Sequence, residues 1–284
     1  MKAYKKLLLL SAFILSAAAV ERLCHHATDG FQLGNIRSSI HASCEPTQIS
    51  GADMANARSI LSQKFHYFGK GAQSYVFASE DGRYILKFFK FQHLRLPPLV
   101  EALPMPGSLK TWIEEKRAKK AEEAEALLAS YKLAFNTFKE ESGLLFAHLD
   151  NSSSLNAQIS IYDPLNIEHK IEADETTFIL QKRADLVLPT LKSHLEKKEL
   201  QAAKECLTSL VALARRCSEK GIYDRDPHLT KNFGFIENRA LLIDCGSLST
   251  ERADQRESMK SGSLEQWLAD ESEELLHFFL ELKK

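Results

Sequence analysis

The part of this chain that most constrains its fold runs from Gly221 to Ser247. Two apolar pieces, Phe233–Ile236 and Ala240–Ile243, are separated by three polar residues, a pattern that predicts two short strands joined by a turn. Polar residues stand at both ends of this predicted hairpin: Asp224, Asp226, His228 and Asn232 precede it, and Asp244 follows it. Carboxylate and amide oxygens are the ligands that Mg²⁺ uses when it also holds phosphate. The stretch therefore predicts a site for metal and phosphate.

These residues also follow the order of a known catalytic core. Arg225-Asp226, Asn232 and Asp244-Cys245-Gly246 match the Arg-Asp of H-R-D, the catalytic-loop Asn and D-F-G, so the stretch resembles the protein-kinase-like superfamily. The resemblance implies that Asp226 orients an attacking hydroxyl and that Asn232 and Asp244 bind Mg²⁺.

The chain departs from that pattern at the start of the loop. Asp224 replaces the His of H-R-D, and five residues rather than four separate Asp226 from Asn232. Asp226-Pro227-His228 also resembles the D-x-H of small-molecule kinases such as the aminoglycoside phosphotransferases. That second resemblance makes His228 a further candidate catalytic residue.

A glycine-rich hairpin precedes this core. Aromatic and β-branched runs at Phe65–Phe68, Tyr75–Ala78 and Tyr84–Phe89 predict three strands, with G-K-G-A-Q-S between the first two. Residues without side chains let backbone N–H groups approach phosphate. The segment resembles the kinase loop G-x-G-x-x-G-x-V, and the matching positions are Gly69, Gly71, Ser74 and Val76.

Lys87 on the third predicted strand stands where the family has the lysine that pairs the α- and β-phosphates. Strand alternation also allows Lys87 to lie on an exposed sheet face. A long helix is predicted to begin at Ser108 and to have residues 138–145 at its far end. In the family a helix Glu pairs with the strand lysine and is followed three and four residues on by apolar residues; Glu141, with Leu144 and Leu145, fits this pattern, and Glu140 is the second candidate. An ordinary surface carboxylate is the alternative for Glu141.

The remaining segments complete a two-lobed prediction. Three more strands are predicted at Gln158–Tyr162, Ile167–Ile171 and Thr176–Gln181. The family's adenine-binding backbone would follow at Gln181. We expect an α+β, protein-kinase-like fold with a five-stranded antiparallel sheet in an N-lobe, residues 53–185, and a reduced, mainly helical C-lobe, residues 186–284.

The amino-terminal end predicts targeting. Lys2, Lys5 and Lys6 precede an apolar run that ends in small residues, which is typical of a signal peptide or membrane anchor over residues 1–19. Residues 20–52 lack a clear period and are expected to form a linker. We expect a domain that is exported or membrane-anchored outside the cytoplasm, with membrane association through this segment.

Composition narrows the function further. The net charge of −1 does not favour nucleic acid as a partner, and five widely spaced cysteines do not form a disulfide framework or a C-x-x-C site. The sequence predicts an ATP- and Mg²⁺-dependent phosphotransferase that acts on a hydroxyl group of a protein or small molecule. Two alternatives stay open: an inactive pseudokinase that serves as an exported binding module, and an α+β domain whose polar residues only cap turns.

Overall fold

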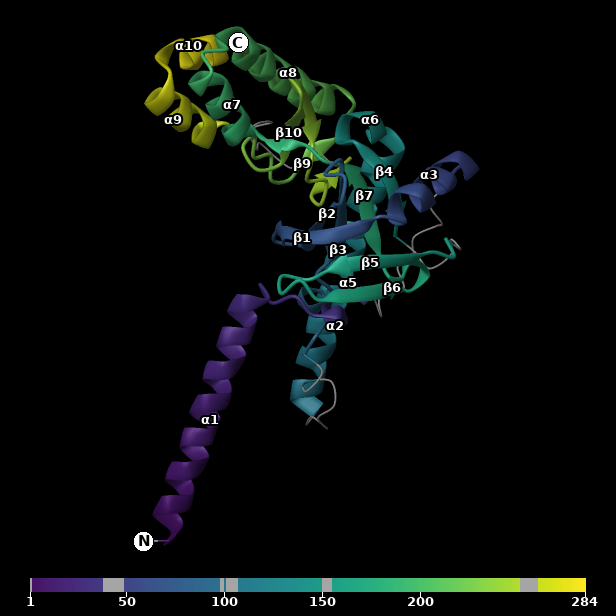
Figure 1. The fold of residues 1–284 in the computed structure, drawn as a ribbon, viewed down its shortest axis with the longest axis vertical. Helices are drawn as coiled ribbons and strands as arrows, with labels where there is room; N and C mark the ends of the chain where they lie inside the picture. Colours follow the sequence, from purple (N-terminus) through teal and green to yellow (C-terminus); the bar gives the residue numbers. More distant parts are fainter. Residues whose placement is uncertain (1, 38–48, 98–99, 101–106, 150–154, 251–259) are drawn as a thin grey trace.

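A computed structural model describes residues 2–37, 49–97, 100, 107–149, 155–250 and 260–284. The fold is mixed α+β: a large sheet lies beside a mainly helical part at the carboxyl-terminal end, and helix α1 (Lys2–Ala27) projects from the body (Figure 1).

The large sheet has seven strands in the order β4-β7-β3-β2-β1-β5-β6. They are β1 (Lys64–Lys70), β2 (Ser74–Ser79), β3 (Tyr84–Phe89), β4 (Leu144–His148), β5 (Gln158–Tyr162), β6 (Glu168–Glu172) and β7 (Phe178–Lys182). The predicted five-stranded antiparallel sheet is therefore wrong in its strand count. It is also wrong in one pairing, because β1 and β5 run parallel.

Within the large sheet, the strand that the sequence prediction overlooked is β4. Leu144 and Leu145 were expected to continue a helix, but Gly143 at φ 65° ends the four-residue helix α6 (Lys139–Ser142) and turns the chain into the sheet. Glycine adopts this left-handed conformation without a steric penalty, which makes it the usual residue at a helix end.

The carboxyl-terminal part is built on the predicted hairpin. β10 (Phe233–Ile236) pairs with β11 (Arg239–Leu242), so the hairpin is confirmed with its second strand one residue earlier than expected. β8 (Asp185–Leu186) lies along the other side of β10, and β9 (Tyr223–Asp224) pairs with β12 (Leu248–Ser249). The helices here are α7 (Val187–Glu196), α8 (Leu200–Glu219), α9 (Gly262–Glu271) and α10 (Glu273–Lys283).

Two hydrophobic clusters cover the two faces of the large sheet. Side chains along a strand point alternately to the two faces of the sheet, so neighbouring residues of β3 belong to different clusters: Phe88 to one and Phe89 to the other. The cluster around Phe89 extends through helix α5 (Gly107–Thr137) into the carboxyl-terminal helices. Helix α3 (Gly51–Leu61) packs in the other cluster. Two short 3₁₀ turns, Phe91–His93 and Ala173–Glu175, complete the regular structure.

Residues 28–37, which we call the strap, pack on the sheet. Phe31 is buried edge-on against Tyr75 and Phe77, and the Tyr75 hydroxyl donates to Gly30 O at 2.6 Å. The short helix α2 (Leu33–Ile36) closes the strap. The expected linker over residues 20–52 is therefore wrong for the strap and for residues 20–27, which belong to α1; residues 38–48 lie outside the described part.

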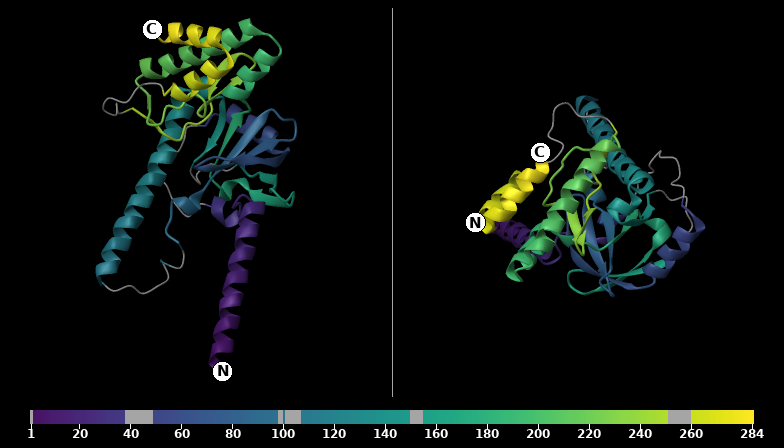
Figure 2. Two further views of the ribbon diagram at one scale, coloured as in Figure 1. Left: turned by 90° about the vertical axis from the view of Figure 1, so that its left-hand side faces the viewer. Right: turned by 90° about the horizontal axis from the view of Figure 1, so that it is seen from above.

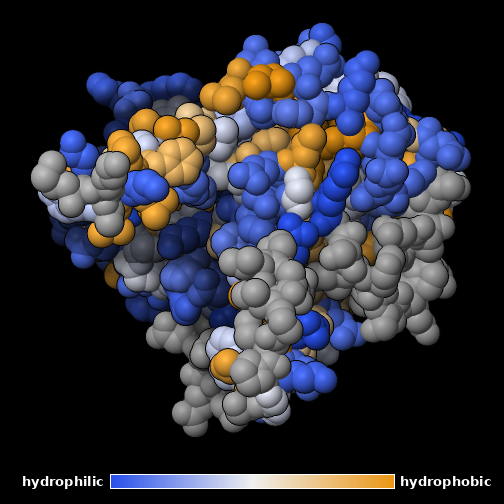
Figure 3. Space-filling view, turned by 90° about the horizontal axis from the view of Figure 1, so that it is seen from below, coloured by the Kyte–Doolittle hydropathy of each residue, from blue (hydrophilic) through white to orange (hydrophobic). Residues whose placement is uncertain are grey.

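Helix α1 contains the predicted apolar segment. Tyr4–Ala27 is long and apolar enough to cross a membrane, judged by length and composition. Helix α1 and the amino-terminal half of α5 project on the same side of the body (Figure 2). Seen from below, where α1 points toward the viewer, hydrophobic residues gather at the left of the molecule and across its upper middle (Figure 3).

Candidate functional site

The loop before β10 is organised by the carboxylate of Asp224. It accepts hydrogen bonds from Asp226 N at 2.9 Å, from Asn232 Nδ2 at 2.9 Å and from Ser247 Oγ. Pairing of β9 with β12 brings Ser247 beside Asp224. Asp224 thus holds together the two loops that flank the hairpin.

Asn232 and Asp244 are brought together by this arrangement. Asn232 is buried, and its backbone carbonyl oxygen accepts hydrogen bonds from Ile243 N at 2.7 Å and from Asp244 N at 3.2 Å. The Asn232 amide nitrogen donates to Asp224 and, at 2.6 Å, to Asp226 O. Its Oδ1 has no hydrogen-bond donor among the residues that the structure describes.

The donor set fits Mg²⁺. Asp244 is exposed, and its Oδ1 accepts from Tyr131 OH at 3.4 Å and Gly246 N at 3.1 Å. One carboxylate and one amide oxygen suffice for an ion that takes its other ligands from phosphate and water. Within the described residues no group of three or more His, Cys, Asp and Glu gathers as an all-protein metal site would require.

Asp226 lies at the surface beside Lys260 and His228. Lys260 Nζ lies 2.7 Å and His228 Nε2 lies 3.2 Å from Asp226 Oδ1. The hydrogen bond from Lys260, helped by the charges of His228 and Lys231, lowers the pKa of Asp226. Sequence reasoning missed Lys260, which is 34 residues away and carries no motif.

A cavity of about 790 Å³ lies between the large sheet and the carboxyl-terminal part. Its walls come from the turn at residues 69–74 between β1 and β2, which we call the glycine hairpin, from β3, from residues 181–186, from α7 and from the residues just after β11. Seven of the predicted site residues line it: Gly69, Gly71, Ser74, Val76, Lys87, Gln181 and Asp244. Asp226, His228, Asn232 and Glu141 are not among its lining residues.

Lys87 lies half-buried in the cavity wall rather than on an exposed sheet face. Its Nζ donates to the carbonyl of Ile243, the residue before Asp244. Burial lowers the pKa of Lys87, and the charge of Asp244 works against this shift. Lys87 and Asp244 therefore share one electrostatic environment.

The predicted pairing of Glu141 with Lys87 is wrong. Glu141 binds the end of α8 instead, with Lys220 Nζ at 3.1 Å and Arg216 at 3.7 Å. The short helix α6 ends at Gly143, and this directs Glu141 away from the cavity. Glu140 is exposed and does not line the cavity.

The Gln181 side chain is structural. Buried at the end of β7, it donates from Nε2 to Ser142 O at 2.6 Å and to Leu242 O at 3.4 Å. It thereby links the large sheet to the β10–β11 hairpin, and the chain that follows it forms one wall of the cavity.

The glycine hairpin closes over the D-C-G segment. Gly71 N donates to Ser74 O at 2.9 Å, which makes the turn tight, and Lys90 Nζ donates to Gly71 O at 2.5 Å. A Cβ at Gly246 would lie 2.1 Å from Gln73 Oε1, so a larger residue at this position would require the flexible Gln73 side chain to move. Neither Gln73 nor Lys90 was predicted, since both act through contacts distant in sequence.

Comparisons with known proteins give faint likenesses. No protein-family model matches the chain, and no curated protein matches it. Among solved structures, the chain is similar to the bifunctional kinase-methyltransferase WbdD, at 15% identity and a TM-score of 0.35, over 72% of this chain and 37% of that one. A second WbdD structure gives 15% identity and a TM-score of 0.33, over 69% of this chain and 34% of that one.

A third likeness is to Rv3197 of Mycobacterium tuberculosis in complex with erythromycin, at 14% identity and a TM-score of 0.32, over 96% of this chain and 74% of that one. The chain spans about a third of the WbdD chains that it matches. Sequence identities and TM-scores this low do not indicate an activity for this protein.

Proposed function

We propose that this protein is an ATP- and Mg²⁺-dependent phosphotransferase of the kinase-like type, which transfers the γ-phosphate to a hydroxyl group of a protein or small molecule. The observation that carries the proposal is the single cavity bordered by the glycine hairpin, Lys87 and Asp244, with Asn232 hydrogen-bonded to the Asp244 backbone. The candidate phosphate-binding groups and Asp244 thus face one space large enough for a nucleotide, and Asn232 lies directly behind Asp244.

Each part of the cavity has a role in this proposal. Val76, Ile85 and Ile243 supply an apolar wall for the base, and the hairpin between Gly69 and Ser74 supplies backbone N–H groups for phosphate. Lys87 neutralises phosphate charge. Mg²⁺, held by Asn232 Oδ1 and Asp244, would neutralise charge that develops on the transferred group.

Asp226 would orient the acceptor hydroxyl. Its low pKa keeps the carboxylate ionised at neutral pH, so it can accept a hydrogen bond from the hydroxyl. Lys260 and His228 fix the position of this exposed side chain. Most of the rate enhancement would come from positioning and charge neutralisation.

Calorimetric titration of the full-length protein in detergent with MgATP tests the nucleotide site. We expect saturable binding that Asp244→Ala abolishes and that Asp270→Ala, which removes an exposed carboxylate on α9, leaves unchanged. A folded protein that gives no heat with MgATP or MnATP would reject the proposal.

A pseudokinase is the second candidate, and one observation favours it. Lys87 is bonded to the Ile243 carbonyl, and Glu141 is turned toward α8, so the lysine lacks the carboxylate partner that active kinases use. This candidate requires MgATP binding without turnover. Release of labelled phosphate or its transfer to a hydroxyl, lost in Asp226→Ala while MgATP still binds, would exclude it.

A further inference from the structure

We propose that α1 anchors the chain in a membrane and that the amino-terminal end of α5 docks on the anionic lipid surface of that membrane. This inference is independent of phosphoryl transfer. It follows from the positions of the two projecting helices and from the residues along one face of α5.

The direction of α1 relative to the body is fixed by the strap. Lys70 Nζ lies 2.9 Å from Asp29 Oδ1, and Tyr67 OH donates to Asp29 Oδ2 at 3.1 Å. With Gly30 held by Tyr75 and Phe31 buried, the chain is anchored to the sheet directly after α1 ends. A membrane around α1 would therefore meet the body at a defined orientation.

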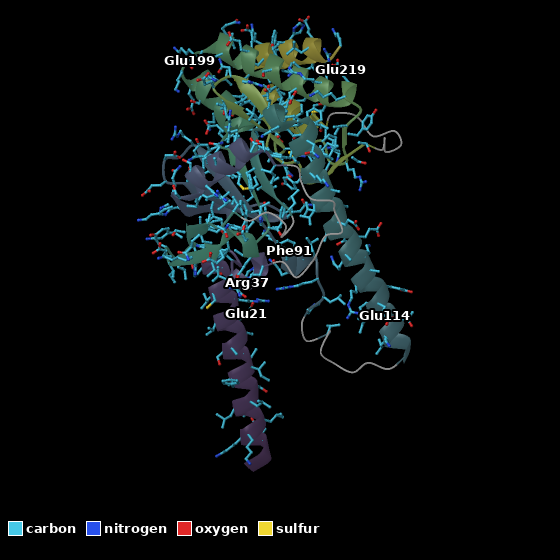
Figure 4. All side chains as sticks on the ribbon, turned by 90° about the vertical axis from the view of Figure 1, so that its right-hand side faces the viewer. Glu21, Arg37, Phe91, Glu114, Glu199 and Glu219 are labelled. Atoms are coloured by element: carbon cyan, nitrogen blue, oxygen red, sulfur yellow. The ribbon has the colours of Figure 1, made fainter. Side chains whose placement is uncertain are left out.

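The tip of α5 reaches the level of the membrane boundary. After Lys6, the first charged residue of α1 is Glu21, so the hydrocarbon layer must end near it. Figure 4 labels Glu21 and Glu114 at a similar height along the direction in which α1 projects, and Figures 1 and 2 show the two helices projecting together. The first turns of α5 therefore lie where lipid headgroups would be.

The residues there match a lipid interface. Leu109 and Trp112 are large apolar residues with exposed fractions of 47% and 51%. At helical spacing the same face continues with three exposed or half-exposed lysines: Lys116, Lys119 and Lys120. With about 1.5 Å of rise per residue, Lys116 lies roughly 10 Å from Leu109 along the axis, comparable to the thickness of a headgroup layer. Tryptophan favours this layer and lysine favours its phosphates.

Charge on this segment contrasts with the rest of the molecule. Residues 107–120 contain five basic and two acidic residues, although the whole chain has a net charge of −1. Lys116 Nζ lies 5.6 Å from the centre of the Trp112 ring, so the aromatic and basic parts form one continuous surface. An anionic bilayer fits this surface better than a protein partner, because a membrane crossed by α1 would lie at the same level.

Tryptophan fluorescence tests this docking. The chain has two tryptophans, so Trp267→Phe leaves Trp112 as the single probe. The full-length variant would be reconstituted into vesicles of phosphatidylcholine with or without phosphatidylglycerol, with acyl chains brominated near the headgroup. We expect loss of most Trp112 emission in anionic vesicles, a much smaller loss in neutral ones, and reversal by high salt.

Charge reversal provides the matched comparison. In the Trp267→Phe background, Lys116→Glu, Lys119→Glu and Lys120→Glu together should remove the quenching. The same three-charge reversal at exposed lysines near the opposite end, Lys192, Lys198 and Lys284, should retain it. Unquenched Trp112 in anionic vesicles, quenching that neither salt nor the reversal reduces, or a chain that alkaline carbonate extracts from the vesicles would each overturn the proposal.

Discussion

Asp224 connects three backbone segments through one carboxylate, which accepts from Asp226, Asn232 and Ser247. Because a hydrogen bond to a charged group is stronger than one between neutral groups, we expect this carboxylate to contribute strongly to the order of the loop before β10. The backbone of the exposed Asp226 is held by Asp224, and Lys260 lowers the pKa of the Asp226 carboxyl group.

Replacing Asp224 by Asn should destabilise the protein by roughly 2 kcal/mol, because the amide has one acceptor oxygen where the carboxylate has two. The expected result is a lower midpoint in urea together with weaker MgATP binding. Ser247→Ala removes a single donor and should cost less. Equal stability of Asp224→Asn and the natural protein would show that the carboxylate does not organise the loops.

Lys260→Ala should move the acid limb of the pH–activity profile upward, by up to about one pH unit. Lys260 lowers the pKa of Asp226, so its removal raises that pKa and protonates the carboxylate at a higher pH. Profiles of kcat/KM measure this shift. Lys260→Arg keeps the positive charge and should give the profile of the natural protein. If the acid limb of Lys260→Ala stays at the same pH, Asp226 does not take part in the reaction.

Sequence reasoning located residues whose partners are near in the chain and missed those that depend on distant contacts. Asn232 and Asp244 flank a hairpin of alternating polar and apolar pieces, so their proximity followed from local pattern. Lys260 meets Asp226 only through tertiary packing. Glu141 was misplaced because two leucines after it fit a helix as well as a strand, and Gly143 decides between them.

At the scale of elements, β10 passes unusually close to the chain that links the two parts. A Cβ at Gly234 would lie 2.7 Å from Asp185 O and 3.1 Å from Ala184 Cβ. Neighbouring backbone cannot move aside as a flexible side chain does, so the β8–β10 pairing requires glycine here. No local signal distinguishes this glycine from a turn glycine in the sequence.

Gly234→Ala should therefore destabilise the protein by roughly 1–3 kcal/mol through overpacking. Thermal unfolding measures the loss. Gly262 provides the control, since a Cβ there meets nothing within 4 Å and alanine should be neutral or slightly stabilising. Comparable effects at both positions would contradict the close approach of β10 and β8.

The strap is the second element-scale feature. Phe31→Ala should cost roughly 3–5 kcal/mol, because it empties a buried site between Tyr75 and Phe77. Leu15→Ala, on the exposed surface of α1, should leave the stability of the body unchanged. Chemical unfolding of the full-length protein in detergent measures both effects. If Phe31→Ala left the free energy of unfolding unchanged, the strap would not contribute to the stability of the body.

Across the whole molecule, lysine–carboxylate pairs join distant segments. Hydrogen bonds from lysines are the main cause that lowers the pKa of five carboxyl groups among the described residues. Glu123 pairs with Lys120 within α5, and the other four pairs join residues farther apart: Asp29 with Lys70, Asp53 with Lys139, Asp226 with Lys260, and Glu265 with Lys283. In each pair the folded pKa lies below the unfolded value, so the unfolded chain binds more protons at acidic pH.

Stability should consequently be fully present above about pH 5 and fall as the pH drops through the ordinary carboxyl range and into the lowered folded values. Urea unfolding between neutral pH and pH near 3 measures this slope. Asp53→Asn, which removes the pair with Lys139 at 2.6 Å, should flatten it. A free energy of unfolding that stays constant on acidification would contradict the contribution of these pairs.

The strap also determines where a soluble form of this protein should begin. Cutting the chain before α3 would remove α1 but would also uncover Phe77 and leave the Tyr75 hydroxyl without Gly30 as its acceptor. Such a fragment would expose a hydrophobic patch beside the glycine hairpin and would tend to aggregate in solution. A form that starts at Thr28 keeps the patch covered, so its yield and monodispersity should exceed those of the shorter fragment.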